Sequence, residues 1–179
     1  MKNCVHKSLV TIPLIVFLFV VSCSRIKQAV YLRQGNAYAK KGQYEQAISD
    51  YTKAIEIDPK DAMAYFNRGL AYGNKGRDDQ AISDFTKAIE IDRKYAMAYF
   101  NRGLAYGNKG QNDQAISDFT KAIEIDPTDA EAYYNRGVVY YSKKEYDKSR
   151  EDVKKAQNLG YQIPTKFLED LGKASGRQN

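Results

Sequence analysis

Few side chains in this chain of 179 residues could carry out covalent or acid–base chemistry. The only histidine is His6 and the two cysteines are Cys4 and Cys23, so all three lie near the start. Histidine is the commonest general base and the commonest transition-metal ligand, and none follows residue 23. The rest of the sequence also shows no Gly-rich phosphate loop and no metal-ligand spacing. We therefore predict that the chain is not an enzyme and holds no cofactor or metal.

Carboxylates are plentiful, and three of them recur at equal spacing, namely Asp58, Asp92 and Asp126. Catalytic carboxylates work as neighbouring pairs with different environments, whereas these three occupy equivalent places in a repeated pattern. The spacing therefore indicates residues at helix ends and turns.

The first residues are predicted to form an export signal. Lys2 and Lys7 precede an apolar run over residues 9–21, about 13 residues long against the roughly 20 that a membrane-spanning helix needs. A basic start, a short apolar stretch and small residues at its end are typical of a signal peptide.

The sequence Val-Val-Ser-Cys at residues 20–23 resembles the bacterial lipobox. The resemblance implies a lipoprotein signal peptide over 1–22, diacylglyceryl on Cys23 and acylation, for example with palmitate, of the new amino terminus. A tether over 23–27 would follow. Ser24 in place of Asp resembles an outer-membrane address, so we expect a lipid-anchored protein of the bacterial cell envelope, at the outer membrane facing the periplasm. The alternatives are an ordinary signal peptide with an incidental cysteine, or an uncleaved anchor.

A stretch of 34 residues occurs twice in succession, at 62–95 and 96–129, with only five differences. A fixed period of this length indicates a solenoid, in which each unit buries its apolar face against its neighbours. Extending the period in both directions gives further units at 28–61 and 130–163. Gly42, Gly76 and Gly110 separate two apolar-periodic runs in the first three units, so each unit is predicted to be a helix–turn–helix.

The repeated residues resemble those of the tetratricopeptide repeat family. That family has aromatic residues at positions 4, 11 and 24 of the unit, small residues at 8, 20 and 27, and Pro at 32. Unit three supplies the full set: Tyr99, Gly103, Tyr106, Ala115, Phe119, Ala122 and Pro127. The resemblance implies an all-α fold, an α-solenoid of four such units over 28–163. A capping helix over 164–174 would cover unit four through Phe167, Leu168 and Leu171, and residues 175–179 would fray.

In this family the first helices of the units line a concave groove that binds partners. The predicted groove residues are Leu32, Asn36, Met63, Phe66, Leu70, Asn74, Met97, Phe100, Leu104, Asn108, Tyr134, Val138 and Tyr141. Units two to four carry Leu or Val where the typical repeat has Asn, so the groove is predicted to bind an apolar or amphipathic segment of another protein. The alternatives are that Leu70 and Leu104 pack between the helices, or that the tail folds back over the apolar strip.

Two other features of the repeats concern charged groups. Cochaperone members of the family hold a peptide carboxylate with Lys and Asn in the first repeat and Lys or Arg in the third. This chain has Leu32 and Asn36 in the first unit and Phe100 and Leu104 in the third, so that clamp is absent. Arg68, Arg102 and Arg136 recur at position 7 and are interpreted as structural surface ion pairs.

Charge and repetition bear on the remaining partners. Without the two signal-peptide lysines the net charge falls from +6 to about +4, with no dense basic block, so no nucleic acid is expected. The predicted function is a protein-interaction scaffold. A self-assembling envelope protein, for instance a homodimer that exchanges units two and three, is the alternative.

Overall fold

The computed structural model describes residues 11–176, with side chains from residue 24 onward. The start of the predicted signal peptide and residues 177–179 of the predicted frayed tail lie outside this range. Within it the chain contains helices and no strands, as the all-α prediction expected. The helices are α1 (Thr11–Lys40), α2 (Tyr44–Ile57), α3 (Ala62–Asn74), α4 (Asp78–Ile91), α5 (Ala96–Asn108), α6 (Asn112–Ile125), α7 (Ala130–Ser142), α8 (Tyr146–Asn158) and α9 (Thr165–Ala174).

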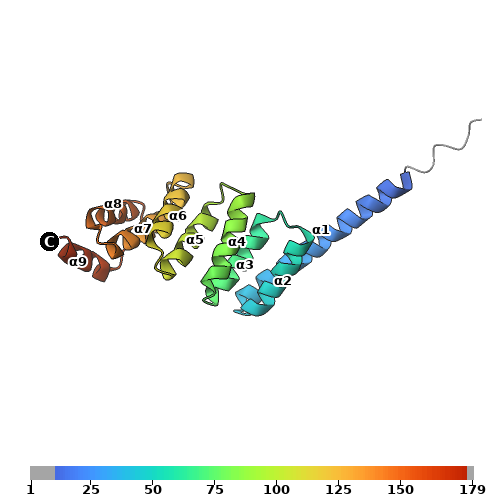
Figure 1. Ribbon diagram of the computed structural model, residues 1–179, viewed down its shortest axis with the longest axis horizontal. Helices are drawn as coiled ribbons and strands as arrows, with labels where there is room; N and C mark the ends of the chain where they lie inside the picture. The colour runs from blue at the N-terminus through green and yellow to red at the C-terminus, as the bar shows by residue number, and fades with distance from the viewer. Residues whose placement is uncertain (1–10, 177–179) are drawn as a thin grey trace, which may run out of the picture.

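The helices α1 to α8 form four pairs that stack into an elongated array (Figure 1). Each helix packs against the next along the chain, and the first helices of successive pairs also contact one another. The α9 helix closes the C-terminal end, while the beginning of α1 extends away from the other end (Figure 1). This arrangement is the predicted α-solenoid with a C-terminal capping helix.

Each pair turns at a residue in the left-handed backbone conformation. Gly42, Gly76 and Gly110 have φ angles of 72°, 68° and 69°, and Lys144 adopts 63° at the same place in unit four. Glycine adopts this conformation without steric penalty, which explains why the turns fall at these residues. Lys144 shows that the geometry of the array imposes the turn even without glycine.

The core lies between the two helices of each pair and depends on glycines that let them approach closely. A Cβ atom on Gly69 would lie 2.7 Å from the Phe85 ring, and one on Gly103 would lie 2.9 Å from the Phe119 ring. Both phenylalanines are almost fully buried. The aromatic ring of the second helix therefore packs directly on the backbone of the first.

The recurring aspartates have the structural role that their spacing predicted. The Asp58, Asp92 and Asp126 carboxylates accept hydrogen bonds from the backbone N–H two residues further on, in the turn after each second helix. Asp61 then caps α3 by accepting from the backbone N–H groups of Met63 and Ala64.

The first helix is longer than the repeat requires. Residues 23–27, expected as a short tether, are helical and continue directly into unit one as part of α1. No Gly or Pro interrupts the sequence between Leu14 and Gln34, which accounts for the continuous helix. In the part of the chain that the structure covers, no helix meets the combined length and hydropathy requirement for crossing a membrane.

Candidate binding groove

The predicted groove residues lie on the first helices of the four units, which run side by side along the array. Met63 on α3 and Met97 on α5 are the most open of the apolar side chains among them, with exposed fractions of 59% and 57%. Two exposed methionines one repeat apart form an adaptable apolar surface.

A cavity of about 180 Å³ opens between α3 and α5. Its lining includes four of the predicted groove residues, Leu70, Asn74, Leu104 and Asn108, which the structure thus brings together. The remaining lining residues are Gly73, Asp78, Ala81, Phe85, Asn101 and Ala105. Gly73 occupies the same repeat position as the predicted groove residue Tyr141, whereas the sequence analysis had not assigned the other five to the groove.

The cavity exists partly because Gly73 has no side chain. A Cβ atom added there would meet only the Ala81 Cβ, at 4.0 Å, and one added to the equivalent Gly107 would meet nothing within 4 Å. In unit four the same position carries Tyr141, whose ring packs against Tyr146 with centroids 5.6 Å apart. In the sequence, the cavity is indicated by Gly73, a glycine inside a predicted helix at a position where neither a turn nor a close contact between helices requires one.

The lining combines apolar side chains with hydrogen-bonding groups. Leu70, Leu104 and Phe85 supply the apolar part. The side-chain amide of Asn74 donates to the Leu70 carbonyl at 2.9 Å, and that of Asn101 donates to the Met97 carbonyl at 2.8 Å. Each amide keeps its oxygen as an acceptor, so the site suits an apolar side chain whose neighbouring backbone N–H groups need partners.

Phe66 does not belong to the exposed strip in which it was predicted. It is 7% exposed, and its ring packs against Phe85 at 5.8 Å and Tyr95 at 4.8 Å between centroids. Tyr95, which stands where units one and three have Asp, covers it. Phe100 is half-buried and packs on Phe119 at 5.7 Å.

The chain itself covers part of the groove in unit four. Tyr134 stacks on Tyr161 at 4.9 Å and contacts the edge of Phe167 at 5.7 Å. Tyr141 contacts the same phenylalanine at 5.4 Å. The alternative that the tail folds over the apolar strip therefore holds for this unit, where Phe167 of α9 lies against both tyrosines.

The remaining predicted groove residues of units one and four, Leu32, Asn36 and Val138, pack or bond within the fold. Leu32 packs against the core of unit one, and Asn36 accepts a hydrogen bond of 2.7 Å from the Tyr51 hydroxyl. Val138 on α7 is half-buried. The open part of the groove is consequently the stretch formed by α3 and α5.

The recurring arginines are largely covered within the array and pair with buried aspartates, so they are not surface ion pairs. Arg102 donates through Nε and Nη2 to both carboxylate oxygens of Asp118, at 2.7 and 2.8 Å, and through Nη1 to Thr86 of the preceding unit at 2.9 Å. The side chains of this pair are 16% and 6% exposed. Arg68 and Arg136 make the same three bonds one unit away on either side.

This ladder accounts for the arginines as structural residues. The hydrogen bond to Asp84 raises the pKa of Arg68, so the guanidinium stays charged. The ladder of bonds does not continue past units one and four. Unit one has Gln34 in place of the arginine, and unit four has Lys154 in place of the threonine. Asp50 of unit one pairs with Lys53 instead, at 2.9 Å.

Among the described side chains, no group of three or more His, Cys, Asp or Glu residues is placed to hold a metal ion. The fold and the groove together define a helical-repeat protein with a surface for binding other molecules.

Family models agree with this class. Models described as TPR repeat or tetratricopeptide repeat match residues 35–76 and 108–144, 62–95, 85–117 and 130–160. The chain belongs to the tetratricopeptide repeat family. A comparison with curated protein sequences gave no match.

Solved structures share the fold. A crystal structure of MamA is 29% identical, with a TM-score of 0.73 over 80% of this chain and 84% of that one. The first repeat domain of Spaghetti (RPAP3), bound to the HSP90 peptide SRMEEVD, is 31% identical, with a TM-score of 0.64 over 65% and 92%. The second domain of human RPAP3, in complex with the HSP70 peptide SGPTIEEVD, is 29% identical, with a TM-score of 0.61 over 66% and 97%.

Proposed function

We propose that this protein is a non-enzymatic adaptor that binds an apolar segment of a partner protein in the groove between α3 and α5. A lipid on Cys23 holds it at the bacterial cell envelope, at the outer membrane facing the periplasm. The observation that carries the binding function is the cavity beside Gly73, open to solvent and lined by Leu70 and Leu104. The lipobox-like residues 20–23 support the anchor.

The chemistry of the groove selects the class of partner. The peptides in the two RPAP3 structures end in acidic residues. Here the cavity lining contains Asp78 and no Lys or Arg, and Leu32 and Phe100 stand where the cochaperone pattern has lysine. An acidic peptide terminus would meet like charge, so the proposed ligand is an apolar or amphipathic segment without that terminus.

Cross-linking in cells would identify the partner. A photoreactive residue in place of Met97 lies on the open side of α5, four residues before Asn101 of the cavity lining. Mass spectrometry of the adduct gives the partner segment, which we expect to contain a bulky apolar residue. An adduct between two copies of this chain would instead support the self-assembling envelope protein.

The cavity is tested by filling it. Gly73→Leu adds an apolar side chain to the lining, whereas Gly107→Leu makes the same change one repeat later, outside the cavity. Excluding one apolar side chain of the partner should weaken binding of the identified segment by about tenfold or more, because burial of such a side chain contributes about 1.5–3 kcal/mol.

The control variant Gly107→Leu should bind the segment as the unchanged protein does. Both variants should keep full helical circular dichroism, since leucine is a better helix former than glycine. Equal affinities of the two variants would show that the partner does not use the cavity.

The anchor is checked separately, because Cys23→Ser should abolish incorporation of labelled palmitate.

A further inference from the structure

The N-terminal end of the solenoid has an apolar face that no described residue covers. Position 3 of the repeat is alanine in units two to four, namely Ala64, Ala98 and Ala132. These alanines have no exposed area, because the preceding unit packs on each of them. The equivalent residue of unit one is Val30, which is 46% exposed, and Ile26 one turn earlier is 63% exposed. At the other end α9 closes the array, but here the apolar face remains open.

This face is in register with the predicted lipid attachment site. Cys23, Ile26 and Val30 are separated by three and then four residues within the continuous helix α1, and such spacing places three positions on one helix face. At 1.5 Å per residue, Ile26 lies about 4.5 Å and Val30 about 10.5 Å beyond Cys23 along the axis. A lipid on the cysteine would bring both to the bilayer surface.

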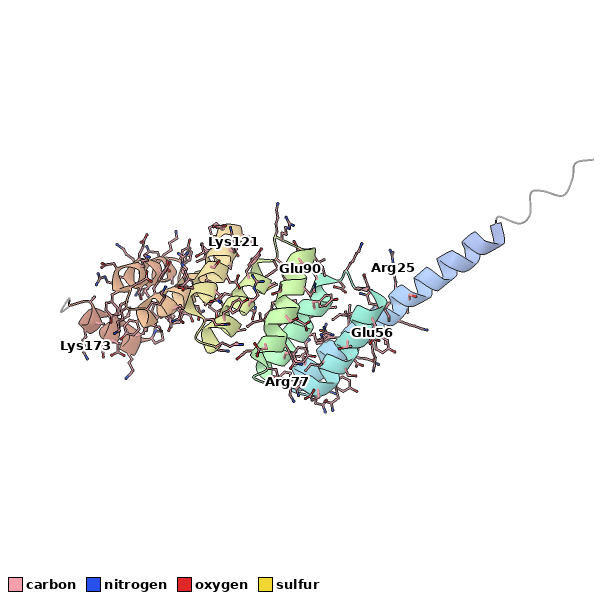
Figure 2. All side chains as sticks on the ribbon, in the orientation of Figure 1. Arg25, Glu56, Arg77, Glu90, Lys121 and Lys173 are labelled. Atoms are coloured by element: carbon pink, nitrogen blue, oxygen red, sulfur yellow. The ribbon has the colours of Figure 1, made fainter. Side chains whose placement is uncertain are left out.

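The same segment carries a net positive charge. Residues 24–44 contain no acidic residue and five basic ones: Arg25, Lys27, Arg33, Lys40 and Lys41. The rest of the chain, 45–179, holds 21 basic and 22 acidic residues and is therefore close to neutral. Arg25 projects from α1 where this helix leaves the array (Figure 2). The net positive charge of residues 24–179 thus lies in this first segment, and Arg25, Lys27 and Arg33 are within three residues of Ile26 or Val30.

We propose that this face of α1, Ile26 and Val30 with Arg25, Lys27 and Arg33 around them, docks on an anionic lipid surface. The inference rests on the proposed lipid anchor and adds a second contact with the membrane. Apolar residues on a basic helix enter the boundary between headgroups and acyl chains, and each basic residue adds about fivefold to partitioning onto an anionic surface. The lipid would cover the open end of the solenoid and fix how the groove is presented.

The absence of tryptophan from the chain makes a depth measurement direct. Ile26→Trp creates a single fluorophore on the proposed face. Ile91→Trp creates one at another exposed isoleucine, on α4 within the array. Each full-length variant is purified in its lipidated form and inserted into vesicles of phosphatidylcholine and phosphatidylglycerol with brominated acyl chains. Flotation of the same vesicles reports the anchor independently.

The expected result is a blue-shifted emission for Ile26→Trp that the brominated lipid quenches, with no quenching of Ile91→Trp. Quenching should weaken in vesicles of phosphatidylcholine alone, and equal quenching there would overturn the role of the basic residues. A chain that floats without quenching at position 26 overturns docking and leaves the anchor intact. A blue shift without quenching indicates a second copy or a protein on this face, and a chain that does not float overturns both the anchor and the docking.

Discussion

At the scale of single residues, the arginine ladder joins the units by hydrogen bonds between buried charges. Each arginine binds both oxygens of an aspartate in its own unit and a threonine hydroxyl in the preceding one, as Arg102 does with Asp118 and Thr86. Bidentate bonds between charged groups are strong and geometrically specific. The ladder therefore sets the position of one unit on the next.

Removing one arginine should be strongly destabilising. Arg102→Leu leaves the Asp118 carboxylate, only 6% exposed, without its partner, and the free energy of unfolding should fall by about 3–5 kcal/mol. Lys109→Leu removes a partner of Asp79, whose side chain is 84% exposed, and should change the same quantity by less than about 1 kcal/mol.

Urea denaturation of the two variants measures the difference directly. Similar midpoints for Arg102→Leu and Lys109→Leu would mean that the ladder contributes no more than an ordinary surface pair.

The sequence contained the evidence for this ladder, although the arginines alone did not reveal their burial. Asp50, Asp84, Asp118 and Asp152 recur at one position of the second helix, and a threonine follows two residues later in the first three units. Reading these positions together with the arginines would have predicted the three-way contact. The burial of Phe66 was harder to foresee, because it depends on Tyr95, which breaks the repeat pattern.

At the scale of one helix, α5 contains two glycines with opposite roles. Gly103 lies where the helix meets the Phe119 ring, and Gly107 faces open space four residues later. Their residue type is the same, so only packing separates them. The family pattern correctly predicted the first as a close contact, and it placed the second at a groove position, which Tyr141 occupies in unit four.

Alanine at these two positions should therefore have opposite effects. Gly103→Ala places a Cβ atom 2.9 Å from the ring of Phe119, which is 1% exposed, and this overpacking should lower the melting temperature. Gly107→Ala should raise the free energy of unfolding by about 0.5–1 kcal/mol through helix propensity. Thermal unfolding followed by circular dichroism tests both, and stabilisation by Gly103→Ala would contradict the close contact.

At the scale of the whole molecule, the near-identity of units two and three makes one unit removable. Deleting residues 96–129 joins Tyr95 to Ala130. Unit four then packs on unit two, which offers nearly the same residues as unit three. Arg136 would then meet Thr86 in place of Thr120, as Arg102 does in the intact chain. The shortened protein should fold with a similar helical content per residue and a lower melting temperature, because one interface is lost.

Deleting residues 96–112 is the matched control, because it removes α5 and leaves α6 without its partner helix. We expect that variant to lose cooperative unfolding in the same circular dichroism experiment. If the variant without residues 96–129 also lost cooperative unfolding, the units would not be equivalent structural modules.

The sequence predicted the architecture because its main determinants are local and repeated. Gly42, Gly76 and Gly110 mark the turns, and the aromatic and alanine positions mark the core. The length of α1 and the contact of Phe167 with Tyr134 and Tyr141 were not predicted in detail. Both occur at the ends of the array, where residues no longer have a neighbouring unit of known sequence to pack against.

The ends of the ladder also limit how copies of this protein can associate. Gln34 replaces the arginine that would reach a preceding unit, and Lys154 replaces the threonine that would receive one from a following unit. Copies placed head to tail would thus lack the bonds that continue the solenoid inside each chain. Open-ended growth into filaments, the hazard of heterologous contacts that do not close, is disfavoured at both ends of the molecule.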